Sequence, residues 1–196
     1  MLNLQSRIFN ILTKPKEEWP VIANESTDVV TLYKEYVAPL SAIPAICGFL
    51  GMTMIGVTVS FTVGNIRTPI SSAFTELVVG YILALLATYL AALVVNKLAP
   101  TFQSGGGIVP ALKMVAFSST AVWVTGIVRV VPALGALLLL AALYGIYLFY
   151  LGLPSVMKTP ADKVIPYTIV CAVVIVVISV VLTSVAGVFT GVARMF

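Results

Sequence analysis

Two charged side chains of opposite sign, Glu76 and Arg129, stand at the ends of long apolar segments, where a charge is costly unless it is paired. Glu76 opens the second such segment and Arg129 closes the third. In the topology derived below both ends face the same side of a membrane, so we expect an ion pair at the outer interface. A structural clamp is the favoured interpretation. The alternative, an ion or proton pathway, would require carboxylates nearer the middle of the segments, and the sequence has none there.

Further polar side chains fall within the second and third segments. Tyr81 and Asn96 belong to the second, and the consecutive hydroxyls of Ser118, Ser119 and Thr120 belong to the third. Any cavity in a bundle of these segments should therefore be lined by those two helices. Hydroxyl groups that bond to the backbone of their own helix are the simpler explanation for most of this polarity.

The residues that enzymes and metal sites usually require are missing from this sequence. It contains no histidine, and its two cysteines, Cys47 and Cys171, both lie inside apolar segments. A thiol in that setting behaves as a small buried hydrophobe, and the spacing matches no metal-ligand motif. We therefore expect a protein that is not an enzyme and that has no catalytic residues, no metal site and no cofactor.

Five apolar segments determine the fold class. With 60% hydrophobic and 9% charged residues, the chain places nearly every ionisable group between segments that are each long enough to cross a bilayer. They are apolar on every side, which excludes the alternating pattern of a membrane β-barrel. We predict an all-α polytopic membrane helix bundle with a cytoplasmic extension at 1–36 and a five-helix domain at 37–196. The expected spans are 38–61, 74–96, 110–128, 133–156 and 164–189.

The distribution of basic residues predicts the orientation. Eight of the eleven lie on the N-terminal side of the membrane and three on the opposite side. By the positive-inside rule the N-terminus is then cytoplasmic and the C-terminus external. The net charge of +4 reflects this topology, and no dense basic patch indicates nucleic-acid binding. The eight are Arg7, Lys14, Lys16, Lys34, Lys97, Lys113, Lys158 and Lys163; the three are Arg67, Arg129 and Arg194.

The segment before the first span predicts a short amphipathic helix. Leu4, Ile8, Ile11 and Leu12 recur at helical spacing among polar residues, so residues 2–12 should lie at the cytoplasmic membrane surface and end before Pro15. The following Trp19, set among charges, has the character of an interfacial anchor. The alternatives are a residue that docks the extension on the bundle, which is the favoured interpretation, and a hot spot for binding a partner.

Small residues predict close helix packing. Gly80 and Ala84 belong to a four-residue repeat on the second span, and Gly187 and Gly191 form a GxxxG on the fifth. Packing within the bundle is the simpler interpretation, and a homodimer seam is the alternative. Prolines and glycines in the first span predict a kinked or loosely wound helix.

The chain resembles the bacterial branch of the Yip (Ypt-interacting protein) family. The resemblance rests on Lys-Pro-x-x-x-Trp-Pro-x-Ile at 14–22, Tyr-Lys-Glu-Tyr-Val-Ala-Pro-Leu at 33–40, and Tyr-Leu-Phe-Tyr-Leu-Gly-Leu-Pro at 147–154 followed by Lys-Thr-Pro at 158–160. Eukaryotic members are Golgi and endoplasmic-reticulum proteins linked to Rab GTPases. They carry a longer N-terminus with an Asp-Leu-Tyr-Gly-Pro signature, of which this chain has only Tyr36 and Pro39, so the resemblance implies a bacterial inner membrane.

Two hypotheses about function follow. The first is a non-enzymatic membrane protein that organises membrane lipids, membrane-protein partners or copies of itself, supported by the amphipathic N-terminus and the small-residue repeats. The second is a small transporter or channel, supported by the proline- and glycine-rich first span and the hydroxyls of the next two. A water-filled cavity that reaches the middle of the membrane would favour the second.

Overall fold

The N-terminal extension consists of two short helices. The structure is a computed structural model that describes residues 3–60, 64–66 and 68–193. Helix α1 spans Leu4–Thr13 and helix α2 spans Pro15–Asn24. Pro15 ends the first helix as expected, and it also starts the second, because its fixed φ and missing N–H suit the first turn of a helix. The predicted amphipathic helix is therefore confirmed, with a second helix directly after it.

The first membrane helix is continuous from Val29 to Ile55 and contains two wide turns. It comprises α3 (Val29–Leu32), a π-helical turn η1 (Tyr33–Val37), α4 (Ala38–Leu50) and a second π-helical turn η2 (Gly51–Ile55). It begins nine residues before the apolar segment because Asp28 caps it, accepting a 2.8 Å hydrogen bond from the Thr31 N–H. The wide turn before Pro39 accommodates a residue with no N–H to donate, so the predicted loose winding is confirmed.

A short hairpin, which the sequence had not predicted, follows the first membrane helix. Gly56, at φ +80°, ends that helix, and strands β1 (Val57–Ser60) and β2 (Gly64–Ile66) pair antiparallel, with Val57 opposite Ile66. The remaining elements are helical: α5 (Ile70–Leu98), η3 (Ala99–Phe102), α6 (Ile108–Thr125), η4 (Gly126–Val130), η5 (Pro132–Leu134), α7 (Leu137–Val156) and α8 (Ala161–Ala193). In the described residues, five helices are long and apolar enough to cross a membrane, as predicted.

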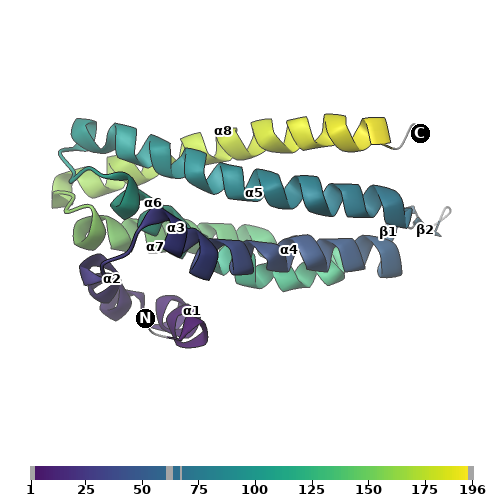
Figure 1. Cartoon of the computed structure of the whole chain (residues 1–196), viewed down its shortest axis with the longest axis horizontal. Helices are drawn as coiled ribbons and strands as arrows, with labels where there is room; N and C mark the ends of the chain where they lie inside the picture. Colours follow the sequence, from purple (N-terminus) through teal and green to yellow (C-terminus); the bar gives the residue numbers. More distant parts are fainter. Residues whose placement is uncertain (1–2, 61–63, 67, 194–196) are drawn as a thin grey trace.

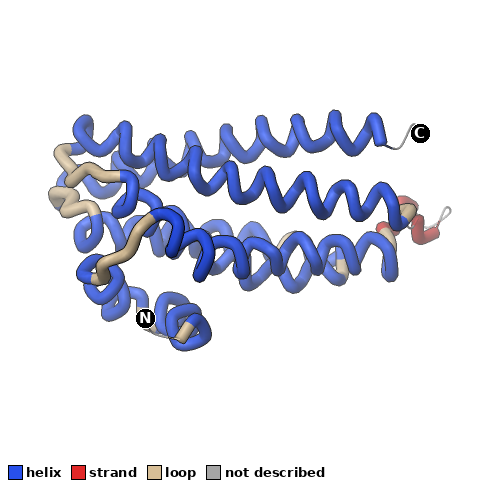
Figure 2. The backbone as a smooth tube through the Cα atoms, in the orientation of Figure 1, coloured by secondary structure: helices blue, strands red, loops and turns tan. Residues whose placement is uncertain are grey.

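The long helices form two layers. Helices α5 and α8 lie side by side in one layer, and α4, α6 and α7 form the other (Figure 1). Most of the connecting loops gather at the end of the bundle near α2, and the hairpin and the C-terminus lie at the opposite end (Figure 2). Helix α6 is the most enclosed, because two thirds of its most apolar stretch is buried against only 6% for α8. The core of the molecule therefore surrounds α6.

Four glycines allow the closest approaches between elements of the bundle. A Cβ built on Gly126 would lie 2.6 Å from Cβ of Pro44, and one on Gly51 would lie 2.2 Å from the carbonyl oxygen of Arg129. Gly145 lies against the backbone of α6 and Gly152 against an indole ring. Only glycine fits these positions without displacing a neighbour. These contacts attach α4 to η4, α7 to α6, and α7 to the extension.

Two glycines of the predicted small-residue repeats do not make such contacts within the bundle. A Cβ added to Gly80 or to Gly187 would meet no atom within 4 Å, so close packing inside the bundle is wrong for both. Ala84 borders a cavity, and the surroundings of Gly191 lie outside the described residues. The reason is that α5 and α8 separate from the other layer along this stretch. The homodimer seam stays a prediction.

Candidate functional site

Trp19 docks the extension on the bundle. Its indole ring is fully buried, lies edge-on to Phe117 of α6 at 6.3 Å between ring centroids, and rests directly on Gly152 of α7. A fully buried ring is out of reach of lipid headgroups, so the docking interpretation holds and the interfacial anchor is wrong. The indole Nε1 is buried without a hydrogen-bond partner in the described structure, so this contact stabilises through apolar packing alone.

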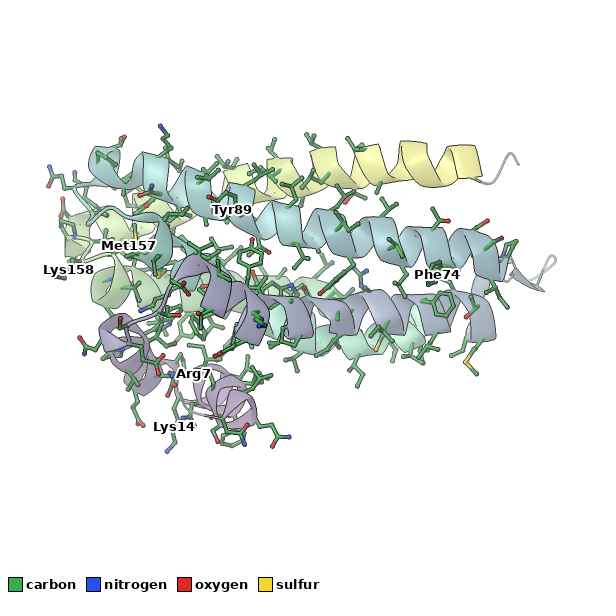
Figure 3. The ribbon with its side chains drawn as sticks, in the orientation of Figure 1. Arg7, Lys14, Phe74, Tyr89, Met157 and Lys158 are labelled. Carbon is green, nitrogen blue, oxygen red and sulfur yellow. The ribbon has the colours of Figure 1, made fainter. Side chains whose placement is uncertain are left out.

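Arg7 is the charged centre of the extension. Its side chain is 5% exposed and pairs with the carboxylates of Glu18 and Glu25, one through each terminal nitrogen. Figure 3 places Arg7 between the extension and the bundle and Lys14 on the outer side. The guanidinium also lies 5.9 Å from the centre of the Phe117 ring. Because a buried guanidinium is tolerated only when its donors are satisfied, these pairs fix α1 against α2.

Lys113 of α6 closes the same network from the membrane side. Its ammonium group donates hydrogen bonds to the carbonyl oxygens of Ile22 at 2.7 Å and Glu25 at 2.6 Å. These carbonyls belong to the last turn of α2 and its cap, which a helix leaves without backbone donors. A cation there also interacts favourably with the helix dipole. Lys113 therefore caps α2 from inside the bundle, and the two basic and two acidic groups balance in charge.

Tyrosine hydroxyls complete the attachment of the extension and of the first membrane helix. Tyr144 of α7 donates to the Leu12 carbonyl at 2.7 Å, and Tyr36 shares a 2.6 Å hydrogen bond with Thr120. On the apolar stripe of α1, Ile11 is fully buried, and Leu4, Ile8 and Leu12 pack against the core. The predicted stripe therefore faces the bundle, and the extension is part of the folded core.

The roles of Arg7 and Lys113 were not predicted from the sequence, although signals for both were present. Arg7 follows Leu4 by three residues and precedes Ile11 by four, which places it on the apolar face of α1. Lys113 lies five residues inside α6, within an apolar run. An ionisable residue in such a run indicates a specific partner. Its acceptors are backbone carbonyls, which no sequence motif marks.

A cleft of about 510 Å³ separates the two layers of the bundle. It is partly open and is lined by α4 and α6 on one side and by α5 and α8 on the other. The predicted participation of α5 and α6 is confirmed, but α4 and α8 line the cleft as well, and α5 supplies the most lining residues. Along α5 the cleft extends from Ala73 to Ala91, roughly 27 Å at a rise of about 1.5 Å per residue. Small residues, including Gly80, Ala84 and Gly48, make it deep.

Glu76 and Arg129 both line this cleft, on opposite walls. Among the described residues the ion pairs within 4.0 Å are Arg7 with Glu18 and with Glu25, Lys14 with Glu17, and Asp162 with Lys163. The expected Glu76–Arg129 pair is not among these, and it stays a prediction. The aliphatic chain of Arg129 passes close to Gly48 of α4, and Glu76 belongs to α5.

The other two polar residues singled out in the sequence have structural roles. The hydroxyl of Tyr81 borders the cleft but donates to the Ala38 carbonyl at 3.1 Å, which ties α5 to α4. Asn96 is at the loop end of α5, and its Oδ1 accepts the Gly107 N–H at 2.7 Å. In the described part of the chain no group of three or more carboxylate or cysteine side chains is placed to hold a metal.

Comparison with known proteins agrees with the motifs of the sequence. The Yip1 domain family matches residues 9–183. The inner membrane protein YohC of Escherichia coli strain K12 is 27% identical over 164 residues, which cover 81% of this chain and 82% of that protein. YohC of E. coli O6:H1 gives the same values. No solved structure matches the chain. The matched region includes all of α2 and nearly all of the cleft lining, and it begins after Arg7 in α1.

The cap formed by Lys113 predicts that Lys113→Met releases α2. The substitution removes two hydrogen bonds from a charged donor, each contributing about 1.5 to 3 kcal/mol. Losing one such contribution corresponds to a roughly ten- to hundredfold rise in the population of molecules whose α2 is detached from the bundle. We expect tryptic cleavage after Lys16 to accelerate by that factor in lipid nanodiscs. The control is Lys97→Met, at the same end of the bundle but exposed; equal cleavage rates in the two variants would contradict the cap.

The contact between Trp19 and Gly152 predicts that Gly152→Ala displaces the indole ring. The added Cβ would lie 2.7 Å from Cε2 of Trp19 and 2.9 Å from the sulfur of Met114, an overpacking that costs about 1 to 3 kcal/mol. In a Trp123→Phe background, tryptophan emission should shift to the red. Gly80→Ala, with open space around the new methyl group, should leave emission unchanged. An unshifted spectrum for Gly152→Ala would exclude this docking geometry.

Proposed function

We propose that this chain, which belongs to the Yip1 domain family, is a non-enzymatic protein of a bacterial inner membrane. Its proposed function is to organise membrane components. By membrane components we mean lipids or the apolar segments of other membrane proteins. The chain is a multi-pass membrane protein with five apolar helices. The inner-membrane assignment draws on the name of its E. coli relative. A cytoplasmic N-terminus remains our prediction from the basic residues, testable by accessibility labelling of an exposed Thr101→Cys.

The observation that carries the proposal is the cleft between the two layers. Arg7, Glu18 and Glu25 of the extension are paired where it meets the bundle, and the apolar stripe of α1 packs against the bundle. The cleft, by contrast, is a concave surface that no part of the described chain fills. Concave, mostly apolar surfaces with a few polar groups are where proteins bind small molecules and lipids. Function is therefore assigned to the membrane-embedded part.

The hydroxyl groups in the cleft favour an apolar occupant over a water-soluble one. Thr88 donates to the Ala84 carbonyl at 2.9 Å, and Ser179 donates to the Ile175 carbonyl at 2.8 Å. Ser41 and Tyr81 both donate to the Ala38 carbonyl. Donors satisfied by the backbone offer little to a polar solute, so the wall is apolar in effect. An acyl chain or an apolar helix matches such a wall.

A small-solute transporter is the second candidate, and one observation favours it. The helix that forms one wall of the cleft is interrupted by two π-helical turns and contains Pro44, features that suit a moving element. Toward the loop end of the bundle, however, the cleft ends against the buried side chains of Ala91 and Val115. Transport would require this packing to open.

Flux and enrichment measurements together distinguish the two candidates. In liposomes reconstituted with the full chain, we expect the flux of protons, alkali cations, phosphate and amino acids to equal that of protein-free vesicles. Solute-specific flux that Gly80→Leu abolishes would establish the transporter instead. In extracts of native membranes, Gly80→Leu should deplete a lipid or protein that accompanies the chain, and Ala142→Leu on the exposed face of α7 should not. No component sensitive to Gly80→Leu would contradict the organising function.

A further inference from the structure

Arg129 is a charged side chain in the cleft without a partner in the described part of the chain. No hydrogen bond or ion pair of its guanidinium is present among the described residues, although the group lines a cavity between membrane helices. A guanidinium at such a position is costly unless it is hydrated or meets an anion. Its planar donors match the oxygens of a phosphate group. These donors are therefore suited to a ligand that carries a phosphate group.

The position of Arg129 is fixed by two close contacts between η4 and the first membrane helix, one with α4 and one with η2. On one side of it, Gly126 lies against Pro44, and on the other, Gly51 lies against the carbonyl oxygens of Arg129 and Val130. No side chain fits at either glycine without moving the backbone opposite, so the turn that carries Arg129 is held rigidly on the first membrane helix. A binding group held in this way loses little entropy when its ligand arrives.

The cleft beside Arg129 has space for an acyl chain. Gly80 and Ala84 leave the floor open, since a Cβ at Gly80 would touch nothing within 4 Å. Phe49, Leu77 and Leu182 contribute apolar side walls. An acyl chain that is already in a membrane is not transferred from water, so it gains only packing contacts in the cleft. Selectivity for one lipid must therefore come from its headgroup.

Glu76 determines which headgroup fits. Its carboxylate shares the cleft with Arg129 from the opposite wall, so a headgroup with a net negative charge would be attracted by one residue and repelled by the other. A zwitterionic headgroup, with its phosphate toward Arg129 and an ammonium group toward Glu76, is complementary to both. A carboxylate has about four acceptor sites, so Glu76 can accept from an ammonium group while keeping its contacts within the chain.

We propose that the cleft binds one phospholipid with a primary-amine, zwitterionic headgroup, its phosphate on Arg129, its ammonium group on Glu76 and an acyl chain along the small residues of α5. This inference rests on the organising function proposed above and names the component that the cleft takes. It requires that the occupant be a lipid and not the helix of another protein.

Lipid retention by the purified chain tests the assignment. The full chain is reconstituted in equal amounts of phosphatidylethanolamine and phosphatidylglycerol, extracted in mild detergent, and its retained lipid is quantified by mass spectrometry. We expect about one phosphatidylethanolamine per chain, retained at least tenfold over phosphatidylglycerol. Arg129→Gln should lower retention of both lipids by tenfold or more. Glu76→Gln should remove the preference between them. Ala84→Leu should abolish retention by filling the cleft.

Two controls separate binding from folding. Lys97→Gln removes an exposed charge elsewhere, and Ala142→Leu adds the same bulk as Ala84→Leu on an exposed face, so both should retain lipid like the wild type. All variants should keep the wild-type thermal transition. If Ala84→Leu lowers it, Gly80→Leu, which points into open space, replaces that variant. Equal retention of the two lipids by the wild type, or retention unchanged in Arg129→Gln, would overturn the assignment. If the lipid assignment fails but Gly80→Leu still depletes a membrane protein from native extracts, the organising function stands and only the lipid assignment is overturned.

Discussion

The structure depends on a cluster of four charged groups where the extension meets the bundle, of which three are buried and Glu25 is partly exposed. Arg7 and Lys113 supply two positive charges, and Glu18 and Glu25 supply two negative ones. Leaving one of these groups buried without a partner costs about 3 to 5 kcal/mol, so each needs the others in place. Lys113 belongs to the most enclosed membrane helix, and both of its acceptors in the described residues lie at the end of α2. The bundle and the extension are therefore required for each other's stability.

This mutual requirement changes what the N-terminus does. An amphipathic segment with a tryptophan among charges is typical of a peripheral anchor that is free to bind a partner. Here Trp19 and Ile11 are fully buried, so α1 and α2 form a fixed third side of the molecule. The surface left for recognition is then the cleft between the layers, where the helices separate at Gly80 and where Arg129 and Glu76 contribute the charge.

Much of the fold followed from the sequence because the bilayer restricts it strongly. Helix length, the five spans and the apolar stripe of α1 all come from patterns that hydrocarbon and its surface impose. The glycines that pack closely, such as Gly126 and Gly152, belong to no small-residue repeat. Each is required by a contact with residues far away in the chain. Lys113 bonds to carbonyls, which every residue has. The cleft arises where the two layers of helices are not in contact, and no local sequence pattern predicts where the layers separate.

The most direct test of the central claim is amide hydrogen exchange of the unmodified chain in lipid nanodiscs. If the buried charges and Trp19 hold the extension on the bundle, the amides of α1 and α2 should exchange slowly, within the range of those at the loop end of α6. Exchange of residues 5–24 at the rate of an unfolded peptide, with α6 still protected, would show that the extension is free and would contradict the account.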